Sequence, residues 1–200
     1  MKITFNLDAL GPMIDWLLKA KNEGIRDEDK LKEILSLPDY EVEFERYADP
    51  NLPVCGIKYE EAFDFFMNFD KKDFDNPRLQ YKKESFINFY ENIEERIKKI
   101  SSFTSLSDND YLVMQELLDN GLPESCTKDI PKLNIILIVS IGNSMGWPYG
   151  HYIDYDVAGL ESFDTKEDFL HVTAHEINHI FVGGLIAPDG IKGEEFFLQN

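Results

Sequence analysis

The apolar run LNIILIVSIG, residues 133–142, restricts the possible folds more than any other part of the sequence. Its β-branched composition and its length are typical of a strand that is buried on both faces. A second run, HYIDYDVAG at 151–159, alternates polar and apolar residues, which predicts a half-exposed strand at the edge of a sheet. The turn-rich segment NSMGWPYG separates the two. We therefore expect a short mixed sheet with an edge strand here.

The preceding residues, from about 7 to 125, show helical rather than strand periodicity. The strongest amphipathic pattern covers residues 84–100, where six apolar side chains recur at helical intervals between charges. An aromatic stripe around Phe65, Phe66 and Phe69 is interpreted as core packing, because aromatic residues at this spacing usually pack inside. The expected class is α+β, with a helical region at 1–127 followed by a sheet-containing module at 128–200.

The charge of the chain argues against several classes of partner. It has 38 acidic against 20 basic residues, a formal net charge of −18, so most of its surface repels nucleic acid.

The two cysteines, Cys55 and Cys126, form no CxxC pair and favour a reducing compartment. The N-terminal segment reaches Asp8 before any apolar run of signal-peptide length, and no stretch of the sequence approaches the length of a membrane span. We expect a cytoplasmic protein that binds neither nucleic acid nor membrane. The sequence does not indicate its oligomeric state.

The segment FDTKEDFLHVTAHEINHIFVGG, residues 163–184, contains the candidate catalytic and metal-binding residues. Thr165 and Asp168 have the spacing of a capping box, and Gly183 and Gly184 supply a stop, so a helix is expected over about 166–182. Within it, residues 175–179 read H-E-x-x-H. Chance placement of the motif in a chain of this composition is expected only about 0.008 times.

This motif predicts a zinc site. His175 and His179 lie four residues apart on one helix face, so both imidazoles can point at one Zn²⁺. Glu176 lies beside them, where it can take a proton from a water molecule and pass it to a leaving amine. The plainer alternative is an amphipathic helix with surface histidines. We consider it weaker, because the apolar neighbours of the motif indicate a buried helix.

The sequence HVTAHEINHIFVG, preceded by two expected strands, resembles the zincin superfamily of metallopeptidases. The helical first half followed by this module is also similar to uncharacterised bacterial families of zinc-dependent peptidases. The resemblance implies that the edge strand binds an extended peptide antiparallel to itself, so that 151–157 would receive the substrate. The motifs that carry this resemblance lie only within about residues 133–183.

The sequence leaves the identity of the third zinc ligand open between several alternatives. The metzincin extension is absent, because Val182 and Leu185 stand where its glycine and third histidine would be. A gluzincin-like arrangement needs a downstream glutamate, for which Glu195 is the first candidate and Glu194 the second. The other interpretation is that the chain ends at Asn200 before its true third ligand, and we slightly favour it.

Four further residues have weaker functional interpretations. His151, Tyr152 and Tyr155 flank the expected substrate strand, and one of them is predicted to bind substrate or to polarise the scissile carbonyl. His171, one turn before His175, is expected to lie in the second shell or on the surface. For His151, Tyr152 and Tyr155 taken singly, a structural role is the better interpretation.

The sequence thus predicts a zinc-dependent peptidase that hydrolyses peptide bonds with Glu176 as general base. Its expected partner is a peptide or protein in extended conformation. Two other functions stay open: a metal-free, degenerate zincin that acts as a binding or scaffold protein, and a zinc hydrolase of a non-peptide substrate.

Overall fold

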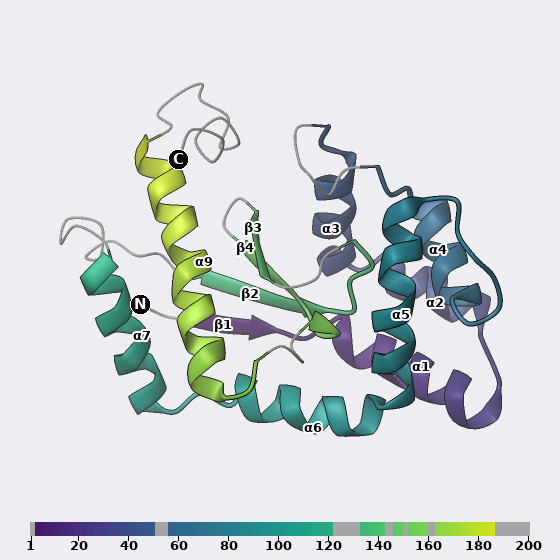
Figure 1. The fold of residues 1–200 in the computed structure, drawn as a ribbon, viewed down its shortest axis with the longest axis horizontal. Coiled ribbons are helices and arrows are strands. Elements are labelled where there is room, and N and C mark those ends of the chain that lie inside the picture. Colours follow the sequence, from purple (N-terminus) through teal and green to yellow (C-terminus); the bar gives the residue numbers. More distant parts are fainter. Residues whose placement is uncertain are drawn as a thin grey trace.

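The computed structural model describes residues 3–50, 56–121, 133–142, 146–149, 152–159 and 163–186 of the chain. Helices and a small mixed sheet make up an α+β fold (Figure 1), as the sequence predicts. The elements in chain order are β1 (Ile3–Asn6), α1 (Leu10–Glu23), α2 (Glu28–Leu35), α3 (Pro38–Ala48), α4 (Tyr59–Asn68), α5 (Pro77–Glu91), α6 (Ile93–Thr104), α7 (Asp108–Gly121), β2 (Leu133–Ile138), β3 (Gly146–Tyr149), β4 (Tyr152–Asp156) and α9 (Lys166–Ile186).

The sheet has four strands in the order β1-β2-β4-β3. Strands β1, β2 and β4 are parallel, and β3 is antiparallel to β4. The first strand pairs Ile3 with Leu133, so the sheet combines residues from both sides of the expected boundary at residue 127. The helical region therefore begins with a strand, which the sequence analysis missed.

The expected edge strand is placed differently in the structure. Strand β4 forms at the predicted residues, but it lies between β2 and β3 and is paired on both sides. The prediction that it is a half-exposed edge strand is therefore wrong, and Ile153, Tyr155 and Asp156 are all fully buried. The edge position on this side belongs to β3, from the segment that was expected to be a turn.

Helices cover one face of the sheet and the carboxyl ends of its parallel strands (Figure 1). Helix α9 crosses one face of the sheet, where it contacts β3, and α7 lies beside it. Helices α3 and α5 lie at the carboxyl ends of the parallel strands, where Tyr40 of α3 donates a hydrogen bond to the carbonyl of Val139 at 3.1 Å. The predicted aromatic stripe is core, since Phe65, Phe66 and Phe69 are buried against Phe86 of α5.

Several helix boundaries follow local signals. Ser107 and Asp110 cap the start of α7, with the Ser107 N–H donating to the Asp110 carboxylate at 2.7 Å. The amphipathic stretch expected as one helix over 84–100 is divided between α5 and α6 at Asn92. No helix in the described ranges is long and apolar enough to cross a lipid bilayer.

Candidate metal site on helix α9

Helix α9 begins at the predicted cap. The Thr165 N–H and hydroxyl both donate to the Asp168 carboxylate, at 2.9 and 2.7 Å, and the Asp168 N–H donates back to Thr165 at 3.1 Å. These bonds satisfy backbone groups that the first helical turn leaves open. The helix continues through Gly183 and Gly184 to Ile186, so the predicted stop at the glycines is wrong.

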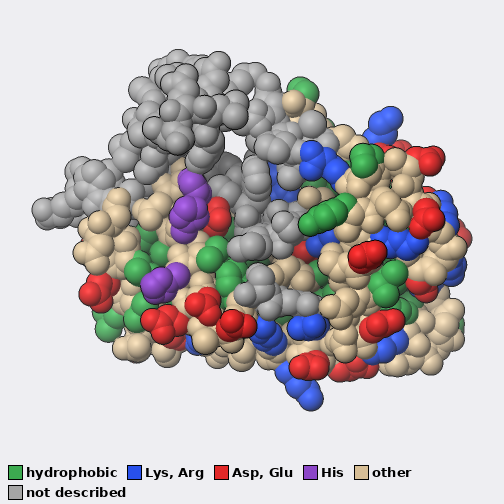
Figure 2. Space-filling view, viewed as in Figure 1, with side chains coloured by type: hydrophobic (Ala, Val, Ile, Leu, Met, Phe, Trp, Pro, Cys, Tyr) green, Lys and Arg blue, Asp and Glu red, His purple; other side chains and the backbone are tan. Residues whose placement is uncertain are grey.

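One face of α9 is buried and the other carries the motif. Phe169, Thr173 and Ile177 are fully buried under the helix. His175 is exposed, whereas His179 and Glu176 are half-buried at the margin of the packed face. Figure 2 shows the histidine side chains of the described residues together on one face of the molecule. The candidate metal-binding pair therefore includes an exposed and a half-buried side chain of a helix whose other face is packed.

The two histidines of the motif point at each other. Their Nε2 atoms lie 2.8 Å apart, and their ring centroids are separated by 4.4 Å at a perpendicular angle. Burial, and then the neighbouring His175, lower the pKa of His179. Its ring is therefore biased towards the neutral form, which is the form that binds metals.

Glu176 lies in a less polar environment than a surface carboxylate. Burial raises the pKa of its side chain from an ordinary 4.5 to about 7. A carboxyl group with a pKa close to neutrality can both accept and return a proton at physiological pH. In the absence of a nearby cation, this environment favours the protonated form.

The geometry of the histidine pair fits a zinc ion. Two nitrogens that bind one tetrahedral zinc at 2.0–2.1 Å lie about 3.3 Å apart. The observed separation of 2.8 Å is close to this spacing, so a small opening of two side-chain torsions would accommodate the ion. Among the described residues, no group of three His, Cys, Asp or Glu side chains lies together. Both candidates for the third ligand, Glu194 and Glu195, lie outside the described residues.

The remaining predicted site residues are dispersed. His151 lies outside the described residues, and Tyr152 is the first residue of β4, although its side chain is not described. Tyr155 is fully buried, and its hydroxyl lies 3.1 Å from the Thr173 hydroxyl of α9. His171 is exposed, with its Nε2 3.9 Å from a carboxylate oxygen of Glu167. Its position agrees with the expected surface role.

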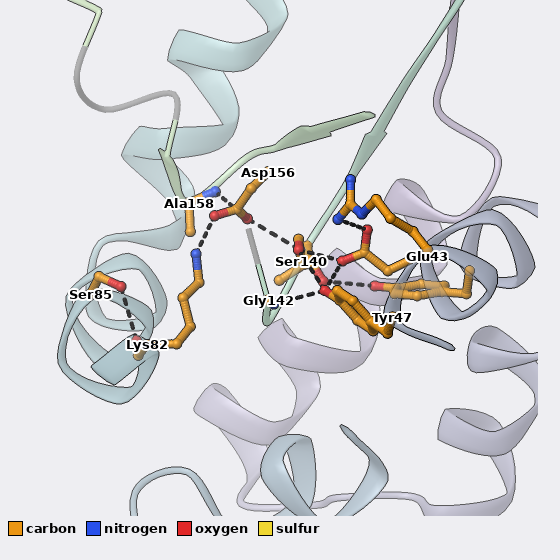
Figure 3. Close-up of polar contacts among 11 residues, drawn as sticks. Glu43, Tyr47, Lys82, Ser85, Ser140, Gly142, Asp156 and Ala158 are labelled. Atoms are coloured by element: carbon orange, nitrogen blue, oxygen red, sulfur yellow. Dashed lines mark hydrogen bonds and ion pairs between the residues drawn. The ribbon is translucent and has the colours of Figure 1, made fainter. Parts of the chain in front are cut away.

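The structure also contains a buried polar network that the sequence analysis did not predict. Lys82 of α5 forms an ion pair with Asp156 at the end of β4, and the other Asp156 oxygen accepts the N–H groups of Ser140 and Ala158, each at 3.1 Å (Figure 3). On the other side, Glu43 accepts the Ser140 hydroxyl. These groups tie the carboxyl ends of β2 and β4 to α3 and α5.

Helix α3 contributes the second half of this network. Glu43 forms an ion pair with Arg46 at 2.6 Å and accepts the Tyr47 hydroxyl, which in turn accepts the Gly142 N–H at 2.7 Å. Glu43, Arg46 and Tyr47 have helical spacing, and their positions in a charged segment give no sign of burial in the sequence. The carboxyl ends of parallel strands are common ligand sites in α/β sheets. Here paired side chains fill that position, and we assign the network to the fold.

Comparisons with protein-family models, with curated proteins and with solved structures gave no match to this chain. The zincin resemblance is therefore supported only by the H-E-x-x-H motif and its setting. A function for this chain must therefore be inferred from the residues of the site.

Proposed function

We propose that the protein is a zinc-dependent peptidase. The observation that carries this proposal is the pair of Nε2 atoms, from His175 and His179, that approach to 2.8 Å on the accessible face of α9, with Glu176 half-buried beside them. Two imidazoles would hold the ion, with Glu195 or Glu194 as the proposed third ligand. The low cysteine content, 2 in 200 residues, favours a reducing compartment such as the cytoplasm.

An ion held by His175 and His179 would supply Lewis-acid chemistry there: zinc would lower the pKa of water to about 7 and polarise a carbonyl group. Glu176 accepts the proton of the attacking water and delivers it to the leaving amine nitrogen. The position of Glu176, half-buried and next to His175 in the motif, is consistent with this role, in which one carboxyl group gains and loses a proton in each turnover.

Because β4 is paired on both sides, we propose β3 instead of β4 as the strand that binds the substrate. In the described part of the chain, β3 has β4 as its one strand neighbour and contacts α9, the helix that carries the motif. An extended peptide paired with β3 would use main-chain hydrogen bonds that require no particular side chain. Pro148 fits this position, since proline is tolerated in edge strands.

Metal analysis of purified protein, combined with peptide cleavage, tests the proposal. We expect one zinc ion per chain, its loss in His175→Ala and His179→Ala, and its retention in Glu176→Gln with turnover abolished. His171→Ala is the matched control, because it removes an exposed histidine from the same helix one turn earlier. Zinc-free protein that is unaffected by His175→Ala would refute the proposal and favour a metal-free binding protein.

A further inference from the structure

Helix α9 is joined to strand β4 by a buried hydrogen bond whose direction can be assigned. The Thr173 hydroxyl donates its single proton to the Phe169 carbonyl oxygen at 2.7 Å. The contact of 3.1 Å between the Thr173 and Tyr155 hydroxyls must therefore use the Tyr155 proton. Burial keeps the pKa of Tyr155 well above its ordinary value, so the phenol retains that proton at physiological pH.

The surroundings of this hydrogen bond are apolar. Phe169 packs against Tyr155 with ring centroids 5.4 Å apart, and it also stacks with Phe103 at 5.6 Å and with Phe5 at 6.1 Å. Apolar contacts hold the helix on the sheet but have little directional preference. A hydrogen bond is directional and is stronger in a medium of low dielectric constant. The Tyr155–Thr173 bond is therefore suited to fix the rotation of α9 about its own axis.

Rotation of α9 changes where Glu176 lies relative to the sheet. At about 100° per residue, Glu176 is turned about 60° from Thr173 and His175 about 160°. Thr173 thus faces the sheet, His175 faces away, and Glu176 lies at the margin, in agreement with its half-burial. At a side-chain radius of about 5–6 Å, a rotation of about 10° moves the carboxylate by about 1 Å.

We propose that Tyr155 and Thr173 are positioning residues, whose hydrogen bond sets the rotation of α9 and so aligns Glu176 with a substrate held on β3. The alignment part of this inference rests on the proposed peptidase function. The three motif residues share one helix, so a rotation moves them together and leaves the spacing of His175 and His179 unchanged. Zinc binding by the pair should persist while catalysis fails.

Kinetics and metal analysis test the alignment. In Tyr155→Phe we expect stoichiometric zinc, little change in KM, and a kcat reduced about 10- to 100-fold, as for a displacement of about 1 Å. Thr173→Val should cause the same loss without adding to it in the double variant. Thr173→Ser, which keeps the hydroxyl, should recover most of the activity. Tyr81→Phe, at a tyrosine that is 84% exposed, is the matched control. Wild-type kcat in Tyr155→Phe would overturn the proposal.

A distance measurement tests the rotation without activity. Spin labels at His171→Cys on α9 and Tyr81→Cys on α5, in protein that also carries Cys55→Ser and Cys126→Ser, report the orientation of α9 by pulsed electron paramagnetic resonance. We expect Tyr155→Phe to broaden or shift the distance distribution, and Thr173→Ser to preserve it. An unchanged distribution in Tyr155→Phe would overturn this inference, whether or not the protein is active. Absence of zinc and turnover in the wild type, with a changed distribution, would instead refute the proposed function.

Discussion

The half-buried carboxyl group of Glu176 makes the stability of the metal-free protein depend on pH. Its pKa rises from an ordinary 4.5 to about 7 on folding, so the folded state holds the proton more tightly than the unfolded state. The stabilisation is fully present below pH 4.5 and decreases as pH rises through about 7, where the carboxylate must be ionised inside the fold. Glu176→Gln removes this dependence because the amide side chain of glutamine does not ionise in this pH range.

The size of the effect follows from the pKa. A rise from 4.5 to about 7 corresponds to about 3 kcal/mol of free energy. Glu176 is only half-buried, and water screens part of the interaction, so we reduce this value to about 1.5 kcal/mol. His179 has a lowered pKa and gives the opposite trend, but it is present in both proteins and cancels in their difference.

Urea unfolding at a series of pH values, with a chelator present, measures this difference. The unfolding free energy of Glu176→Gln minus that of the wild type should increase by about 1.5 kcal/mol between pH 4.5 and pH 8. Addition of zinc to the wild type should reduce the pH dependence, because a nearby cation favours the ionised carboxylate. A difference that is constant over this range would refute the inference that the fold buries Glu176.

Three further substitutions test the packing around the site, each by urea or thermal unfolding. Gly142→Ala should lower the unfolding free energy by about 1–3 kcal/mol, because the new Cβ would lie 2.4 Å from a ring carbon of Tyr47; no change would contradict the close approach. Asp156→Asn should cost about 3–5 kcal/mol, since it leaves the Lys82 ammonium buried without its counter-ion, and a small cost would indicate that water reaches Lys82. Phe169→Ala should cost about 3–5 kcal/mol through the cavity it creates, and a loss below 1 kcal/mol would argue against the stacked core.

The parts of the fold that the sequence predicts depend on local signals. The start of α9 is predicted because the Thr165–Asp168 capping pair lies within four residues, and β2 because its apolar run is unbroken. Strand β1 has four residues, which is too short to show a period, and its partner lies far along the chain. Strand β3 contains Gly146 and Pro148 and therefore has the composition of a turn.

The same distinction applies to the site. The convergence of His175 and His179 is predictable because helix geometry alone brings positions i and i+4 together. The degree of burial of the Glu176 side chain depends on how α9 packs on the sheet, and no local sequence pattern predicts that packing. The burial of Asp156 was also missed, because an alternating strand is expected to expose one face, whereas here Lys82 reaches it from α5.

The pairing of β1 with β2 has a consequence during synthesis. Ile3 leaves the ribosome 130 residues before its partner Leu133. At 5–20 residues per second, the first strand waits for roughly 7–26 s with an unpaired edge. During this interval α1–α7 can form local contacts, but the sheet that supports α9 cannot assemble. We expect the nascent chain to be most prone to aggregation in this interval, and the motif helix to become ordered after α1–α7.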